Sequence, residues 1–124
     1  MRHDHLLCDL WFAEDDQLKY VDPLRTILLE AAKAGGAVVY HVHFHQFLPW
    51  GVTGFLLLKE SHISLHTWVE ERYAALDIFP CGAMDSHAIV QYLVDRLRPR
   101  QVNVIQAGRG RSEAQIIATN VGHS

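Results

Sequence analysis

The chain has 124 residues, a formal net charge of −3 at pH 7 and two cysteines, which fits a single domain, residues 1–124, with a modest core. The slightly acidic balance does not favour nucleic-acid binding, and no apolar stretch is long enough to cross a membrane. We expect no signal segment and no structural disulfide, and therefore a cytoplasmic protein.

The first expected elements are a strand and a helix. In residues 5–12 apolar side chains occupy every second position, which predicts a strand with one buried face. Asp22 is the expected N-cap of the helix, with Pro23 at its first position, and Gly35-Gly36 ends it.

Several strands follow before a second helix. β-Branched and aromatic residues are typical of strands, and they concentrate in the ranges 37–47, 52–60, 62–68 and 72–79. Ser86 is the expected cap of the second helix, which ends before Pro99, and a last strand covers 101–106. The small, polar tail, residues 108–124, is expected to be loose.

This order of elements predicts the fold class. Runs of neighbouring strands favour antiparallel pairing, and two helices set among them can cover the same face of the sheet. We therefore expect an α+β fold, a two-layer α/β sandwich with a mainly antiparallel sheet and both helices on one face.

Three histidines, His41, His43 and His45, alternate along one expected strand and point to the same side. Two histidines at this spacing can share a zinc ion. However, His41 and His45 lie about 13 Å apart along a strand, and the spacing of the other histidines supplies no third ligand. The sequence therefore predicts no metal site, but a polar sheet face that meets a partner subunit or lines a site.

The stretch "SHISLHTW" (61–68) also has an unusual polar face. Ile63 and Leu65 are expected to face the core, which puts His62, Ser64 and His66 on the other side. A solvated face more often carries lysine, glutamate and threonine, so these histidines indicate a covered or functional surface. Cys81, in a loop after a strand, could form a nucleophilic pair with His66, and a buried, unreactive cysteine is the alternative.

Three segments resemble a known family: "GVTG" (51–54), "KESHISLHTW" (59–68) and "YAALDIFPCG" (73–82). They are similar to the small prokaryotic S-adenosylmethionine decarboxylases, whose pattern is G-V-[ST]-G, then E-S-H-[IL]-[ST]-[IL]-H-T-W-P-E, then Y-A-A-x-D-x-F-x-C-G. The resemblance extends over about residues 5–110.

The resemblance implies a proenzyme that cuts itself between Glu60 and Ser61, giving chains 1–60 and 61–124. Ser61 would become a covalent pyruvoyl group, which replaces pyridoxal phosphate and takes the substrate amine as a Schiff base. Thr53 and His66 would assist the processing.

The remaining site residues also follow from the resemblance. Cys81 would be the proton donor in decarboxylation, Phe47 would stack on the adenine, and Glu70 would bind the ribose hydroxyls. The family fold is a two-layer sandwich that forms homodimers with active sites between protomers, and its product serves spermidine synthesis.

The chain departs from the family pattern after Trp68. Val69 replaces the usual proline before Glu70, and Glu71-Arg72 follow. These changes keep an alternative open, in which the same machinery acts on L-ornithine or L-arginine. A further alternative is an unprocessed, non-catalytic relative that serves as a binding or assembly module.

Overall fold

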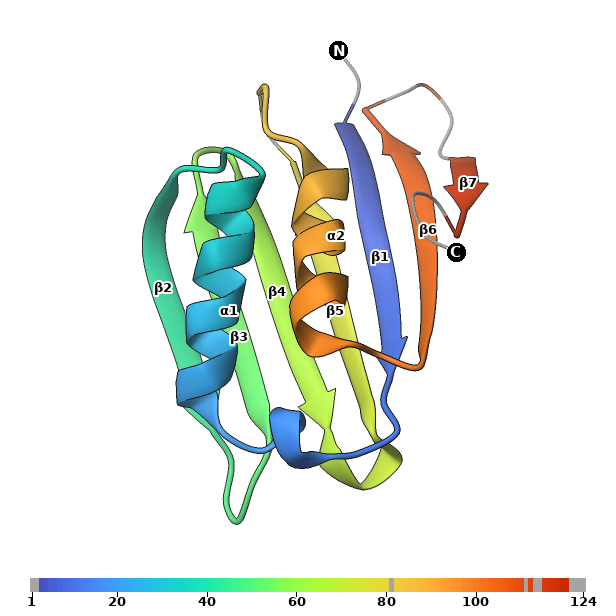
Figure 1. The fold of residues 1–124 in the computed structure, drawn as a ribbon. Helices are drawn as coiled ribbons and strands as arrows, with labels where there is room; N and C mark the ends of the chain where they lie inside the picture. The colour runs from blue at the N-terminus through green and yellow to red at the C-terminus, as the bar shows by residue number, and fades with distance from the viewer. Residues whose placement is uncertain (1–2, 81, 111, 113–114, 121–124) are drawn as a thin grey trace.

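The protein forms one antiparallel sheet with two helices on one face, as a computed structural model of residues 3–80, 82–110, 112 and 115–120 shows (Figure 1). The strand order is β2-β3-β4-β5-β1-β6-β7. The strands are β1 (His3–Trp11), β2 (Val39–Gln46), β3 (Val52–Leu58), β4 (Ser61–Trp68), β5 (Tyr73–Phe79), β6 (Gln101–Arg109) and β7 (Gln115–Thr119). The helices are α1 (Val21–Ala34) and α2 (Ser86–Leu97), with short 3-10 turns η1 (Asp16–Leu18) and η2 (Val69–Glu71). The predicted fold class is confirmed.

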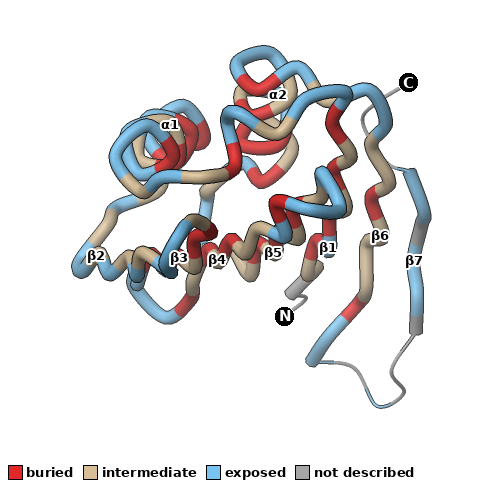
Figure 2. The backbone as a smooth tube through the Cα atoms, turned by 90° about the horizontal axis from the view of Figure 1, so that it is seen from below, coloured by how far each residue is buried: buried red, intermediate tan, exposed pale blue. Residues whose placement is uncertain are grey.

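The core lies between the sheet and the two helices, which Figure 2 shows as a separate layer above one sheet face. Strands β3, β4 and β5 bury every second residue, as period-two alternation requires. Each helix contributes an apolar stripe, with Leu24 and Leu28 from α1 and Ile89 and Leu93 from α2. No helix of the described residues has the length and apolar character needed to span a membrane.

Both predicted helix caps are wrong by one or two residues. Helix α1 begins after Tyr20, so Asp22 lies in the first turn, where it pairs with Arg25 at 3.1 Å. Proline lacks an N–H, and the first-turn N–H groups have no intrahelical acceptor, so Pro23 fits within that turn. In α2 the cap is Asp85, whose carboxylate accepts from the Ala88 N–H at 3.0 Å.

The strand ends also differ from the expected ones. β3 stops at Leu58, β4 begins at Ser61, and β6 continues to Arg109. Part of the tail expected to be loose forms β7, which pairs with residues 105–108 of β6. The edge of β6 offers unpaired backbone groups that a following segment can satisfy. Residues 111, 113–114 and 121–124 of that tail lie outside the described residues.

Gly54 allows β2 and β3 to pack closely. A Cβ at this position would lie 2.1 Å from the Phe44 ring. We expect Gly54→Ala to lower the free energy of unfolding by about 1–3 kcal/mol, since overpacking forces shifts in neighbouring groups. Urea unfolding of the Ser61→Ala background, in which self-cleavage is not expected to complicate the measurement, gives this value. The double variant Phe44→Leu, Gly54→Ala should recover part of the lost unfolding free energy. A double variant no more stable than Gly54→Ala alone would contradict the steric explanation.

Candidate active site

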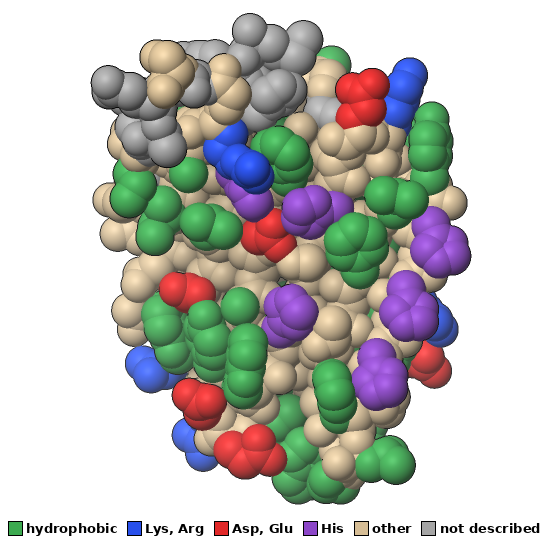
Figure 3. Space-filling model, turned by 180° about the vertical axis from the view of Figure 1, so that it is seen from behind, with side chains coloured by type: hydrophobic (Ala, Val, Ile, Leu, Met, Phe, Trp, Pro, Cys, Tyr) green, Lys and Arg blue, Asp and Glu red, His purple; other side chains and the backbone are tan. Residues whose placement is uncertain are grey.

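The sheet face away from the helices carries most of the polar residues singled out in the sequence. His41, His43 and His45 lie opposite Leu57, Phe55 and Thr53 of β3, so the three histidines share this face. Figure 3 shows histidine and hydrophobic side chains spread across it. Its exposed apolar residues, 37–44% accessible, are Leu7, Phe55, Leu57 and Trp68. A patch of this kind is typical of a binding or association surface.

Thr53 and His66 form a hydrogen-bonded pair on this face. They are directly paired residues of β3 and β4, and Thr53 Oγ1 lies 3.1 Å from His66 Nδ1. When Nδ1 donates this hydrogen bond, Nε2 is left as a base. The pair lines a cavity of about 270 Å³ together with Phe47 and Glu70. The structure therefore brings four of the predicted site residues into one place.

Glu70 is held at the rim of this cavity. It lies in η2, which is anchored by the buried Val69 (2% exposed). The indole of Trp50 donates to Glu70 Oε1 at 2.7 Å and holds the pKa of this carboxyl below its ordinary value. Arg72 is exposed and does not line the cavity, so its charge does not enter this part of the site.

Glu60 and Ser61 lie at the other end of β4, in the hairpin between β3 and β4. Leu58 pairs with Ser61, which leaves a two-residue turn of Lys59 and Glu60. Glu60 has φ 66°, a left-handed conformation that costs a residue with a side chain about 1–2 kcal/mol. Ser61 is 7% exposed and faces the core, and its Oγ has no hydrogen-bond partner among the described residues.

One chain does not bring all the predicted residues together. Ser61 and His66 are five residues apart along β4, about 17 Å at the rise of a strand. Their side chains also lie on opposite faces of the sheet. The Ser61 end and the Thr53–His66 end are therefore two separate half-sites in one protomer.

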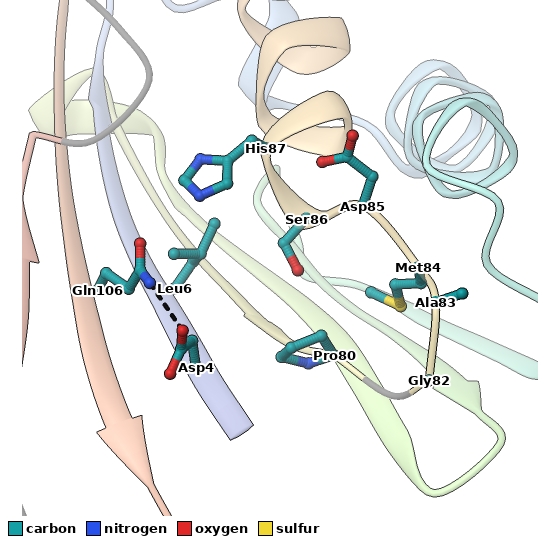
Figure 4. Close-up of a pocket in the computed structure, with 10 residues that line it drawn as sticks. All are labelled: Asp4, Leu6, Pro80, Gly82, Ala83, Met84, Asp85, Ser86, His87 and Gln106. Atoms are coloured by element: carbon teal, nitrogen blue, oxygen red, sulfur yellow. Dashed lines mark hydrogen bonds between the residues drawn. The ribbon is translucent and has the colours of Figure 1, made fainter. Parts of the chain in front are cut away.

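A second cavity lies near the Ser61 end, between β1, β6 and the start of α2. It has a volume of about 490 Å³ and is lined by Asp4, Pro80, Gly82, Ser86 and Gln106, among others (Figure 4). Gln106 donates to Asp4 at 2.9 Å. Since His62 pairs with Phe79, the next position outward places Ser61 beside Pro80. The loop after β5 therefore starts next to the predicted cleavage point.

The predicted proton donor, Cys81, lies outside the described residues. The other cysteine, Cys8, is buried in the core, and desolvation, together with the charges of Asp9 and Asp77, raises its pKa to about 12. A thiol with this pKa remains protonated at neutral pH, so Cys8 does not act as a nucleophile.

The sequence interpretation missed a cluster around Asp77 on the open face. His5 and His62 contact Asp77 Oδ2 through Nε2 at 2.6 and 2.8 Å, and Ser64 donates to Oδ1. Burial by itself would raise the pKa of Asp77, but the hydrogen bonds from Ser64, His5 and His62 outweigh it and hold the pKa below its ordinary value. The period-two alternation in the sequence placed His62 and Ser64 on one face of their strand. The same alternation, applied to residues 72–79, could have placed Asp77 on the same face of the sheet.

This cluster is the one group among the described residues with metal-ligating geometry. Its hydrogen bonds favour a different role. Arg109 Nη1 lies 3.3 Å from His5 Nδ1, and a guanidinium can only donate, so Nε2 of a neutral His5 carries the proton. A protonated Nε2 donates to Asp77, and a metal ion would have to replace this proton to bind there. The cluster is therefore a hydrogen-bonded network that ties β1 and β4 to β5.

The fold and these half-sites define the class of protein. It is a small α+β sandwich with two separate polar half-sites, the Thr53–His66 pair on the open sheet face and a buried serine that follows a left-handed residue at the other end of β4.

The comparisons with known proteins agree with this description. The family model for S-adenosylmethionine decarboxylase matches residues 4–110. The S-adenosylmethionine decarboxylase proenzyme of Persephonella marina is 39% identical over 118 residues, 94% of this chain and 89% of the relative. The proenzyme of Methanococcus maripaludis is 40% identical over 107 residues, 86% of this chain and 88% of the relative. The crystal structure of the Aquifex aeolicus adenosylmethionine decarboxylase has a TM-score of 0.80 and 32% identity, covering 90% of this chain and 92% of that one. The chain belongs to the S-adenosylmethionine decarboxylase family.

Proposed function

We propose that this chain is the self-cleaving precursor of a pyruvoyl-dependent decarboxylase that acts on S-adenosylmethionine. The observation that carries the proposal is the Glu60–Ser61 junction, where a left-handed Glu60 precedes a buried serine hydroxyl that has no hydrogen-bond partner in the part of the chain that the structure describes. This junction coincides with the E-S-H motif of the family. The names of the relatives favour S-adenosylmethionine over L-ornithine or L-arginine as the substrate.

The proposed self-cleavage uses only protein groups, with Ser61 from one chain and His66 from the partner chain of the dimer proposed below. Ser61 Oγ attacks the Glu60 carbonyl carbon, the peptide C–N bond breaks, and an ester replaces the amide. A base then takes the Ser61 α-proton, and the Cβ–O bond breaks to release residues 1–60 with a carboxylate end. The resulting dehydroalanine is hydrolysed to a pyruvoyl group and ammonia. We assign the base to His66, oriented by Thr53 at 3.1 Å.

The fit of the pyruvoyl group rests on Ser61, which directly follows Glu60 and whose buried hydroxyl has no hydrogen-bond partner among the described residues. The pyruvoyl ketone supplies an electron sink for loss of carbon dioxide from an α-amino acid. Phe47, which is 48% exposed at the cavity, offers a ring face for the adenine, and Glu70 offers acceptors for the ribose hydroxyls. Cys81 is proposed as the proton donor. The proposal needs neither pyridoxal phosphate nor a metal ion.

We further propose that the active enzyme is a homodimer in which each site combines two protomers. The support is the separation of the half-sites along β4, about 17 Å at the strand rise, together with the exposed apolar residues of the open face. A two-fold axis crossing β4 would reverse this strand in the partner and bring its Thr53–His66 end to the Ser61 end of the first copy. The processed dimer is expected in the cytoplasm, where its product would serve spermidine synthesis.

Two assays test the proposal. Gel electrophoresis and intact mass should show two fragments split between Glu60 and Ser61, the later one without a free amino group. A decarboxylation assay should then show activity with S-adenosylmethionine, and little with L-ornithine or L-arginine. A chain that stays whole after long incubation would support the non-catalytic alternative, and a preference for either amino acid would overturn the substrate assignment.

The left-handed conformation of Glu60 leads to a prediction for the cleavage rate. Glycine adopts this conformation without the steric cost, so Glu60→Gly should stabilise the uncleaved chain by about 1–2 kcal/mol and slow cleavage about 5–30-fold. A time course of fragment formation on gels measures the rate. Glu60→Ala keeps the Cβ and is the matched control, expected to cleave near the wild-type rate. Equal slowing in both variants would assign the effect to the carboxylate instead.

A further inference from the structure

Trp50 is the residue at the Phe47–Glu70 cavity to which neither the motifs nor the family pattern assigned a role. Its indole N–H donates to Glu70 Oε1 at 2.7 Å, and both side chains line the cavity. An ionised carboxylate accepts hydrogen bonds only. Because the indole engages Oε1, the carboxylate is held in one orientation, with Oε2 left to accept hydroxyl groups.

The indole is itself well fixed. Trp50 is half-buried and packs against the core, and the Lys19 ammonium lies 4.5 Å from the centre of its ring. The adjacent Gly51 N–H donates to the Lys19 carbonyl at 2.9 Å, which secures the backbone beside the tryptophan. Two χ angles and contacts of this kind leave the N–H little freedom to turn away from Glu70.

Apart from Trp50, the Glu70 carboxylate has a hydrogen bond with the backbone of Glu70 itself. It is exposed, and no other residue donates to its carboxylate by a side-chain hydrogen bond among the described contacts. The family pattern has a proline directly before this glutamate, where this chain has Val69. The buried Val69 side chain anchors the turn, but a valine fixes the backbone less than a proline does.

We propose that Trp50 is a positioning residue for substrate binding, which aims the Glu70 carboxylate at the 2′- and 3′-hydroxyls of the substrate's ribose. This proposal rests on the role proposed for Glu70 in binding a nucleoside sulfonium substrate. It adds that discrimination for the ribose diol depends on the indole donor of Trp50. In a chain without this donor, the Glu70 carboxylate would be mobile. Such a chain would lose part of its preference for a ribose with both hydroxyls over one without them.

The test compares the processed enzyme acting on S-adenosylmethionine and on its 2′,3′-dideoxy counterpart. Trp50→Phe removes the N–H donor and keeps an aromatic wall. We expect it to raise KM for S-adenosylmethionine about 3–30-fold with little change in kcat, and to leave KM for the dideoxy compound nearly unchanged. Glu70→Gln should also reduce the preference for the diol, and the double variant should lose little more, as coupled residues do.

The possible outcomes separate the two proposals. If Glu70→Gln leaves the diol preference intact, the role of Glu70 fails and the role of Trp50 fails with it. If Glu70→Gln reduces the preference but Trp50→Phe does not, only the positioning role is overturned. An equal rise in KM for both substrates would make Trp50 a wall of the cavity and would also overturn it.

Two further variants serve as a control and as a substitute for Trp50→Phe. Trp11→Phe removes an indole that packs at a tilt against Tyr73 and does not line this cavity, and it should keep the wild-type diol preference. Self-cleavage and circular dichroism report whether each variant folds. If Trp50→Phe does not fold, Lys19→Met loosens the same indole and should reduce the diol preference in the same direction. An unchanged preference in that folded variant overturns the proposal.

Discussion

Ser61→Ala should leave the chain whole and abolish decarboxylation. The variant lacks the side-chain oxygen that attacks the Glu60 carbonyl in the proposed mechanism, so neither the ester nor the pyruvoyl group can form. Because Ser61 Oγ is buried without a partner among the described residues, its removal should cost almost no stability. Gel electrophoresis, intact mass and a carbon dioxide release assay measure these effects.

Ser86→Ala is the matched control for this experiment. Ser86 is also buried, and its hydroxyl likewise has no partner in the described structure. Ser86 lines the cavity beside the cleavage point, so the control removes a buried hydroxyl from the same region, and it should still be cleaved. Cleavage of Ser61→Ala at the same position would assign the nucleophile to another residue and overturn the proposed function.

Two inactive variants should restore cleavage when they are combined. His66→Ala alone should slow cleavage by about 10²–10⁴-fold, the usual contribution of a positioned base. A dimer of one His66→Ala chain and one Ser61→Ala chain contains one complete site, made of Ser61 from the first and His66 from the second. Co-expression with different affinity tags should therefore yield mixed dimers in which the His66→Ala chain is cleaved and the Ser61→Ala chain is not.

The distance along β4 is the physical reason for this expectation. With Ser61 and His66 five residues apart along β4, His66 of the same chain is too far away to act as the base, so the proposed mechanism takes the imidazole from a partner chain. Isolated mixed dimers that remain uncleaved would contradict the shared site. Efficient cleavage of monomeric chains at high dilution would contradict it as well, because the rate would then not depend on association.

The fold could be predicted in outline from the periodicity of the sequence. Alternating apolar residues gave the correct face for β4, with Ile63 and Leu65 inside and His62 and His66 outside. The element ends were less accurate, because the caps depend on local backbone geometry that residue type alone does not determine. Asp85 and Ser86 are both good caps, and only the course of the chain before α2 decided between them. Strand β7 was missed because its stability depends on pairing with β6.

The candidate site was predictable wherever its residues share a motif. The E-S-H and D-x-F-x-C-G patterns identified the family, and Thr53 and His66 are indeed neighbours. The roles of Ser61, Cys81, Phe47 and Glu70 stay predictions until the variants are measured.

The sequence by itself determined the family, the layer architecture and the position of the Glu60–Ser61 junction, because motifs and periodicity are local properties of the chain. Only the tertiary structure decided which side chains meet. Trp50 and Glu70 are twenty residues apart, and Asp77 gathers His5 and His62 from two other strands, through a register that no local pattern encodes. The structure likewise set Ser61 and His66 apart, because a strand keeps residues five positions apart distant and on opposite faces.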